Sequence, residues 1–173
     1  NKLTKEIQGI PLIKHSVKNI LASSVDELII VLGYQNKIIE KLIDKHQKIK
    51  IFFNKDFESG IASSIKVGIN NLSKKTESFF ICLGDMPMID KKIYNHLISF
   101  RNKKDIIVPT YNNIQGNPVL FSKLIRPEIL SIDGDMGAKK ILEINKNKIM
   151  KIKIDDASIT RDFNTINDFN SSS

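Results

Sequence analysis

The segment 79–87, Phe-Phe-Ile-Cys-Leu-Gly-Asp-Met-Pro, joins an uninterrupted apolar run to a glycine, an acid and a proline. An apolar run without polar alternation is typical of a strand that is buried on both faces, as in the middle of a parallel sheet. In open α/β sheets, ligands bind beyond the carboxyl ends of such strands. Asp85 is therefore expected to point into a ligand crevice, where it is a candidate metal ligand. The alternative is that Asp85 caps the following helix, since aspartate is a favoured N-cap residue.

Strand and helix patterns alternate along most of the sequence. Apolar runs predict strands, and apolar residues at helical spacing predict the helices between them. The predicted strands are 27–32, 49–53, 79–83 and 106–109, and the predicted helices start near Pro11 and cover about 35–47, 61–72 and 90–101. Alternation of this kind predicts right-handed βαβ units and an α/β fold with a mostly parallel sheet.

Beyond Tyr111 the pattern changes. A polar turn at 112–116 and a short apolar run at 119–121 precede a helix predicted at about 137–145, a half-exposed strand at 149–154 and a last short helix after 162–165. No internal repeat or low-complexity linker divides the chain, so one domain is predicted for residues 1–173.

The length and composition are those of one domain with a substantial core, since 41% of the 173 residues are hydrophobic. The apolar runs are shorter than the ~18 residues that a membrane-spanning helix needs, and no charged-then-apolar leader is visible. The single cysteine, Cys82, excludes an internal disulfide and is expected to be a small buried residue. These features predict a cytoplasmic protein without a membrane partner.

The net charge of +8 comes from dispersed lysines, because only residues 101, 126 and 161 among the 27 basic residues are arginine. Recognition of nucleic acids favours clustered arginine and aromatic stacking platforms. Neither is visible here, so no nucleic-acid partner is predicted. The charge is compatible with a phosphate-rich ligand.

Several common catalytic motifs are absent from the sequence. There is no P-loop, no His-x-x-x-His pair beside a cysteine, and no Gly-x-Ser-x-Gly elbow. What remains is a set of oxygen donors, Asp85 after one strand and Asp162 or Asn164 near another. Carboxylate and amide oxygens together with substrate phosphates suit Mg²⁺, which is the predicted cofactor.

Seven segments occur in the order found in one enzyme family. Together they resemble the MobA-like nucleotidyltransferases and, within them, the molybdenum cofactor cytidylyltransferase branch. The segments are Lys2-Leu3 with Gly9–Leu12, Val31–Tyr34, Asn54–Gly60 with Ser63-Ser64, Leu83–Pro87, Gly116–Val119, Gly134–Ala138 and Asp162–Thr165. The resemblance covers nearly the whole chain and implies a three-layer Rossmann-like α/β fold with a mostly parallel sheet.

The resemblance also implies a segment that these residues do not contain. In that family, a glycine-rich loop after the first strand wraps the triphosphate, just before the position of Lys2. Residues 1–173 are therefore expected to be a single MobA-like domain that lacks the N-terminal strand and the phosphate loop.

The resemblance assigns site residues by position. Lys2 matches a lysine that contacts the phosphates, and Asp85 matches the aspartate that binds Mg²⁺. Asn164, with Asp162, matches a second metal-binding position. The implied nucleotide-binding residues are Lys2, Gly33, Asn54, Gly60, Ser63, Ser64, Gly84 and Asp85. Helix capping is the alternative role for the two serines.

The acceptor side is implied by two further segments. Gly116, Asn117 and Pro118 match a Gly-His-Pro motif in which asparagine here replaces histidine, and Asp135 lies in the other segment. The implied enzyme is a Mg²⁺-dependent nucleotidyltransferase that moves CMP from CTP, or the corresponding group of another NTP, to the terminal phosphate of molybdenum-molybdopterin and releases pyrophosphate. A molybdoenzyme or its chaperone is a further implied partner.

Three other functions stay open at this point. A sugar-1-phosphate nucleotidyltransferase would share the fold and the metal chemistry. A glycosyltransferase would use Asp133-Gly134-Asp135 as a metal motif, although these acids suit the entrance of a helix equally well. A non-catalytic relative would bind the pterin or a partner without turnover.

Overall fold

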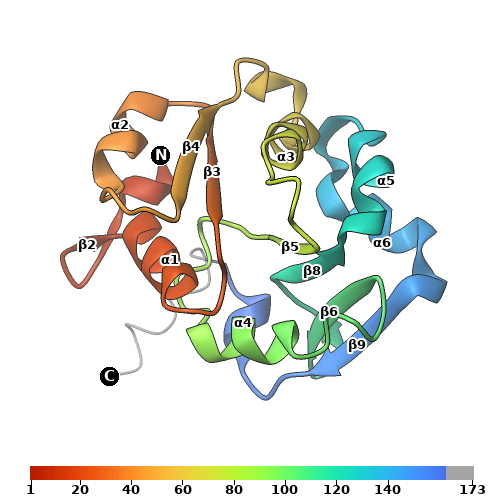
Figure 1. Ribbon diagram of the computed structural model, residues 1–173. Helices are drawn as coiled ribbons and strands as arrows, with labels where there is room; N and C mark the ends of the chain where they lie inside the picture. Colours follow the sequence, from red (N-terminus) through yellow and green to blue (C-terminus); the bar gives the residue numbers. More distant parts are fainter. Residues whose placement is uncertain (163–173) are drawn as a thin grey trace.

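The computed structural model describes residues 1–162, in which helices and strands alternate as predicted (Figure 1). The helices are α1 (Leu12–Leu21), α2 (Asn36–Leu42), α3 (Ile61–Asn70), α4 (Lys91–Ile98), α5 (Arg126–Leu130) and α6 (Gly137–Ile144). The strands are β1 (Glu6–Ile7), β2 (Ile10–Pro11), β3 (Leu28–Leu32), β4 (Ile49–Phe53), β5 (Ser78–Ile81), β6 (Ile106–Tyr111), β7 (Ile114–Gln115), β8 (Val119–Ser122) and β9 (Ile149–Lys153). None of the helices in this part of the chain is long and apolar enough to span a membrane.

The larger sheet has five strands and is built around β6. Strand β9 pairs with β6 in parallel, whereas β8 pairs antiparallel with both β6 and β5. Strands β5, β6 and β9 therefore run in one direction, and β8 runs against them. The short β7 forms a hairpin with the end of β6. The sheet is thus mixed in its pairing but mostly parallel in strand direction, which confirms the predicted α/β class.

Side-chain alternation along these strands produces three layers. Ile106 and Val108 face a core that includes residues of α3, α5 and α6, while Ile107 faces a second core built with α4. Because neighbouring residues of a strand point to opposite faces, one apolar run supplies both cores. All three of these residues are at most 1% exposed, and truncation of such a residue to alanine costs about 2–5 kcal/mol.

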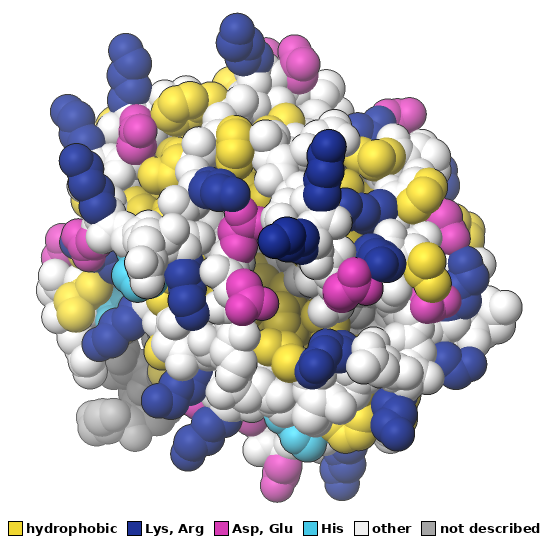
Figure 2. All heavy atoms as spheres, in the orientation of Figure 1, with side chains coloured by type: hydrophobic (Ala, Val, Ile, Leu, Met, Phe, Trp, Pro, Cys, Tyr) yellow, Lys and Arg dark blue, Asp and Glu magenta, His cyan; other side chains and the backbone are white. Residues whose placement is uncertain are grey.

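A separate two-stranded sheet stands beside the larger one. Strands β3 and β4 pair in parallel from Leu28 with Ile49 to Leu32 with Phe53, and α1 and α2 pack against them. No strand within residues 1–162 pairs with the second edge of β3 or of β5. These strands lie on the two sides of a gap in Figure 1, and Figure 2 shows a hollow with a hydrophobic floor near the centre of the same face.

Several predicted elements end earlier than the sequence indicates, among them the helix predicted at 90–101, which ends at Ile98. The helix predicted at 35–47 stops at Leu42, because Ile43 adopts an extended backbone with ψ 117°. The strand predicted at 79–83 ends at Ile81, whose partner Val119 begins β8. Val119 follows Pro118, which has no N–H to extend the ladder. Cys82 is consequently half-buried in a loop rather than fully buried in a strand.

Candidate functional site

The loop after β5 holds Asp85 beside Lys2. The carboxylate of Asp85 forms an ion pair with the ammonium group of Lys2, and the Asp85 side chain is 16% exposed. Asp85 does not cap the next helix, because α4 begins at Lys91 and its N-cap is Asp90. The capping alternative for Asp85 is therefore wrong. A carboxylate and a cation meet here at the carboxyl end of a strand, as expected for a ligand crevice.

Helix α1 fixes this loop by two hydrogen bonds. The Ser16 hydroxyl donates to the carbonyl of Gly84 (2.9 Å), and the Asn19 amide donates to the carbonyl of Pro87 (2.9 Å). Gly84 packs closely, since a Cβ at this position would lie 3.3 Å from Cδ1 of Ile13. Sequence reasoning missed Ser16 and Asn19. The signal for Ser16 is weak: it is a small polar residue, 4% exposed, within the apolar face of an amphipathic helix.

A second group of predicted residues gathers where β4 ends. The amide of buried Asn54 donates to the hydroxyls of Ser63 (2.7 Å) and Ser64 (2.9 Å), and its oxygen accepts from the backbone N–H of Asp56 (3.0 Å). The N-cap of α3 is Gly60, with no side-chain cap bond, so neither serine has the N-cap role. The structure instead brings Asn54 and both serines together at the start of α3.

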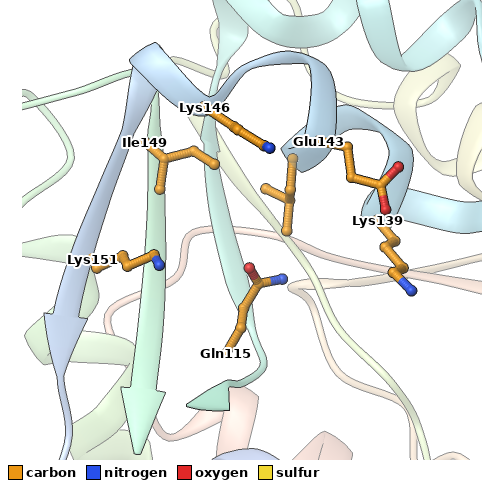
Figure 3. A pocket seen from close by; sticks show the side chains of 7 residues that line it. Gln115, Lys139, Glu143, Lys146, Ile149 and Lys151 are labelled. Atoms are coloured by element: carbon orange, nitrogen blue, oxygen red, sulfur yellow. The ribbon is translucent and has the colours of Figure 1, made fainter. Parts of the chain in front are cut away.

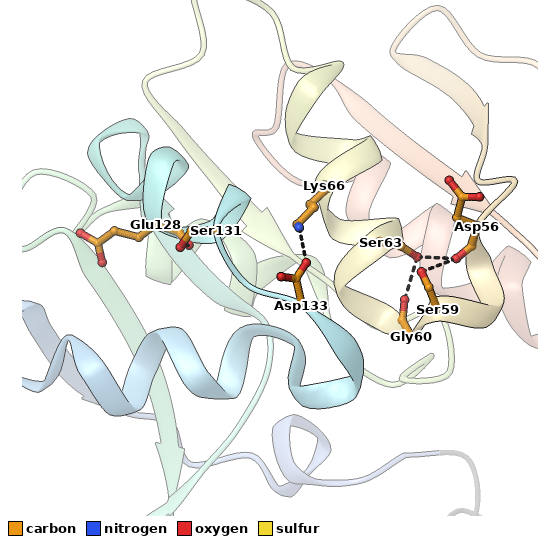
Figure 4. Close-up of polar contacts among 8 residues, drawn as sticks. All are labelled: Asp56, Ser59, Gly60, Ser63, Lys66, Glu128, Ser131 and Asp133. Carbon is orange, nitrogen blue, oxygen red and sulfur yellow. Dashed lines mark hydrogen bonds and ion pairs between the residues drawn. The ribbon is translucent and has the colours of Figure 1, made fainter.

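Gly60 brings the start of α3 against the loop at 133–137. Its φ is +105°, and a Cβ there would lie 2.6 Å from the carbonyl oxygen of Gly134 and from Oδ1 of Asp135. The ammonium of Lys66 also binds Oδ1 of Asp133 at 2.6 Å (Figure 4). These contacts place Gly60, predicted on the nucleotide side, next to Asp135, predicted on the acceptor side.

Asp133, the first acid of that loop, forms an ion pair with Lys66. The hydrogen bond from Lys66 and its positive charge hold the pKa of Asp133 below its ordinary value. The carboxylate of Asp133 is therefore paired with Lys66 at the surface. Among residues 1–162 no group of three or more His, Cys, Asp or Glu side chains is arranged to hold a metal ion.

Gly33 closes the end of β3 against the loop before α3. A Cβ on Gly33 would lie 2.6 Å from Cβ of Phe57, so no side chain fits there without displacing that residue. The ring of Phe57 lies 6.4 Å from that of Tyr34, measured between centroids, and Tyr34 is 64% exposed. Gly33 therefore acts through packing against Phe57, whose ring contacts the exposed ring of Tyr34.

The Gly116-Asn117-Pro118 turn packs against the segment that leads to Asp162. The backbone N–H of Asn117 donates to the carbonyl of Ile159 (2.8 Å), and a Cβ on Gly116 would lie 2.6 Å from the same oxygen. Asp162 is half-buried at the end of the described chain. Asn164, predicted as a metal ligand, lies outside the described residues. The roles of Asp162 and Asn164 stay predictions.

Comparison with known proteins gives one family. The family model described as MobA-like NTP transferase domain matches residues 1–150. The chain is 28% identical over 154 residues to the molybdenum cofactor cytidylyltransferase of Escherichia coli (strain K12). This alignment covers 89% of this chain and 77% of that protein.

Two solved structures have the same fold. A nucleotidyl transferase from Methanothermobacter thermautotroptrophicus superposes with a TM-score of 0.80 at 15% identity and covers 98% of this chain and 82% of its own. The Rv0371c protein of Mycobacterium tuberculosis H37Rv, in complex with manganese, superposes with a TM-score of 0.78 at 17% identity and covers 90% of this chain and 82% of its own. At these identities the two structures establish the fold alone.

Proposed function

We propose that this chain, which belongs to the MobA-like NTP transferase family, is a cytidylyltransferase that moves CMP from CTP to the terminal phosphate of molybdenum-molybdopterin. The observation that carries this proposal is the pairing of Lys2 with Asp85 at the carboxyl end of β5. A cation suited to phosphates and a carboxylate suited to Mg²⁺ meet in one crevice. The similarity to the Escherichia coli cytidylyltransferase supports the choice of CTP and of a molybdopterin acceptor.

In the proposed reaction, an oxygen of the acceptor phosphate attacks the α-phosphorus of CTP. A new P–O bond forms, the bond to the β-phosphate oxygen breaks, and pyrophosphate leaves with that electron pair. Lys2 would offset the negative charge that grows on the transferring group. Asp85 would hold Mg²⁺, which supplies charge neutralisation and alignment of the phosphates when bound. Positioning of the two reactants supplies much of the remaining rate enhancement.

The start of α3 would hold part of the nucleotide. Its first turn contains no acidic residue, and its N-cap residue Gly60 provides no side-chain cap. The backbone N–H groups of a first helical turn have no partner within the helix and attract anions. Asn54 fixes Ser63 and Ser64, and so the orientation of this turn. A phosphate or ribose oxygen is therefore the group we place there.

One further strand would complete the site. The facing edges of β3 and β5 lack a strand partner within residues 1–162, and the face between them is hollow and hydrophobic (Figure 2). Unpaired sheet edges are costly and are normally covered. The resemblance stated above implies a strand with a glycine-rich phosphate loop, and a strand inserted between these two edges would join both sheets into one. Such a loop would then face Lys2.

The test is pyrophosphate release by the full-length protein with molybdenum-loaded molybdopterin, Mg²⁺ and each of CTP, GTP, ATP and UTP. We expect pyrophosphate release with CTP. For Asp85→Asn we expect kcat to fall by about 10²–10³, because the variant loses one interaction that stabilises charge in the transition state. Asp26→Asn, in an exposed loop before β3, is the matched control and should retain the wild-type rate.

Other outcomes separate the alternatives. Release with a sugar 1-phosphate, but not with the pterin, would replace the proposed acceptor and keep the reaction type. Pterin binding without release from any triphosphate would indicate a non-catalytic relative. An unchanged rate for Asp85→Asn would remove Asp85 from the metal site. We further propose a cytoplasmic location, where a molybdoenzyme or its chaperone would receive the product.

A further inference from the structure

A shallow open pocket of about 490 Å³ lies between α6 and β9, outside the candidate site (Figure 3). It is lined by Gln115, Lys139, Leu142, Glu143, Lys146, Ile149 and Lys151. None of these residues belongs to the nucleotide-binding or metal-binding set proposed above. Figure 3 shows the side chains of Lys146, Lys151 and Gln115 turned towards the space between the strand and the helix.

The walls of the pocket carry a net positive charge. Three lysines line it against a single glutamate. No ion pair within residues 1–162 uses Lys139, Lys146 or Lys151. The adjacent Lys148, by contrast, binds a carboxylate oxygen of Glu128 at 2.7 Å. Lysines that share a concave surface repel one another, and a bound anion relieves that repulsion.

The floor of the pocket is apolar. Leu142 is 6% exposed and belongs to the core beneath α6, and half-buried Ile149 packs against the same core. The side chain of Lys151 lies on the same face of β9 as Ile149, because alternate residues of a strand share a face. The pocket thus joins an apolar base to ammonium groups and one amide, which is a common composition for a small-molecule site.

We propose that this pocket binds a small organic anion that carries phosphate or carboxylate groups at two ends of a planar or apolar body. Lys146 and Lys151 bind one anionic group with help from the Gln115 amide, Lys139 binds the other, and the body lies on Leu142 and Ile149. The volume falls in the range of about 300–1,000 Å³ found for small-molecule pockets. The proposal does not rest on the proposed function, because binding is measured without turnover.

The probe for the test is 4-carboxyphenyl phosphate, titrated calorimetrically into the full-length protein at about 150 mM salt. We expect saturable binding at one site and backbone amide shifts at Gln115, Leu142 and Lys151 in NMR spectra. The double variant Lys146→Gln/Lys151→Gln should bind about tenfold more weakly or worse, since it loses charged contacts. Gln115→Glu should weaken binding similarly, because it adds a negative charge of nearly the same shape.

The control is Lys41→Gln/Lys45→Gln, two exposed lysines at and beyond the end of α2, which should bind as the wild type does. Saturating CTP should leave the probe affinity unchanged. Equal losses of probe affinity in the control and pocket variants would show that the probe binds to surface charge in general, and would overturn the proposal. Competition by CTP would indicate that the probe binds at the nucleotide site, and would also overturn the proposal. Binding of an oligoglutamate peptide, but not of the probe, would replace the small molecule with an acidic partner segment.

Discussion

The ammonium group of Lys2 forms an ion pair with the carboxylate of Asp85, although Lys2 lies in the first short helix (Lys2–Thr4) and Asp85 follows β5. Both residues have proposed roles with a different partner, Lys2 with phosphates and Asp85 with Mg²⁺. The ion pair therefore represents the state that nucleotide and metal would replace. The pair compensates the charge of both residues, which avoids a lone carboxylate at a half-buried position.

This relationship predicts opposite effects of Lys2→Met on metal binding and on turnover. Without the competing ammonium group, Asp85 should bind Mn²⁺ several-fold more tightly in the absence of nucleotide, as measured by the EPR signal of free Mn²⁺. The kcat for pyrophosphate release should fall by about 10²–10³, with a smaller change in nucleotide affinity. Lys18→Met, on the exposed side of α1, should change neither. Weaker Mn²⁺ binding in Lys2→Met would contradict competition for Asp85.

Alanine substitutions at Gly60 and Gly134 form a matched pair that tests the loop contact at the start of α3. Gly60→Ala places a methyl group 2.6 Å from the Gly134 carbonyl at a φ of +105°, whereas Gly134→Ala, at φ +75°, meets nothing within 4 Å. We expect urea unfolding to show a loss of about 2–4 kcal/mol for Gly60→Ala, from clash plus strain, and about 1 kcal/mol for Gly134→Ala. Equal losses would show that the close approach of the two loops contributes nothing.

The ion pair of Glu128 with Lys148 is expected to make a pH-dependent contribution to the free energy of unfolding. Its hydrogen bond from Lys148, joined by one from Asn145, holds the pKa of its carboxyl below the ordinary value of 4.5, against a smaller opposing effect of burial. Because the folded pKa is lowered, the stabilisation is present above pH 4.5 and is lost as the pH falls through the folded pKa. The pair is partly exposed, so its contribution is small.

Glu128→Gln should therefore reduce the free energy of unfolding by about 0.5–1 kcal/mol near pH 7, and the difference from wild type should shrink as the pH falls below 4.5. Urea unfolding curves at several pH values measure this. Glu40→Gln, on the exposed face of α2, should show little pH-dependent difference. A Glu128→Gln difference that persists at the acidic end would rule out a charge-dependent origin.

Cys82 is predicted to be unreactive in the folded protein. The residue as a whole is half-buried, but desolvation of its thiol raises the thiol pKa to about 12, although a hydrogen bond with Tyr94 acts in the opposite direction. At about pH 8 only about one thiol in ten thousand would then be ionised, compared with about a quarter in an unfolded chain. Alkylation by iodoacetamide should be about 10³-fold slower in buffer than in urea. Rapid native modification would disprove the raised pKa.

The sequence predicted most elements because their signals are local. Strand β4 matches the predicted 49–53 in full, and Pro11 and Gly60 lie at the starts of the helices predicted after them. The end of β5 was missed because it depends on where β8 begins, not on its own residues. Helix α2 is shorter than its apolar pattern for a similar reason, since Ile43 packs against the β3–β4 core in an extended conformation.

The candidate site, like the fold, contains residues that the sequence indicated and residues that only the structure revealed. The resemblance pointed to Asp85, Gly60 and Asn54 one residue at a time, and the structure brings Gly60 against Asp135 and Asn54 against the serines of α3. Sequence reasoning did not find the two residues of α1 that hold the loop after β5, nor the lysines of the pocket beside β9. Those lysines look like any dispersed surface charge until the fold places them around one cavity.

The amino-acid order by itself determined the α/β class, the sequence of strands and helices, and the position of an acid just beyond a buried strand, because hydrophobic periodicity and backbone stereochemistry act between near neighbours. Only the tertiary structure decided that β8 runs against its neighbours, that Lys2 faces Asp85, and that three lysines share a pocket. These contacts join distant residues. They depend on strand pairing and on the packing of whole layers, which no local pattern encodes.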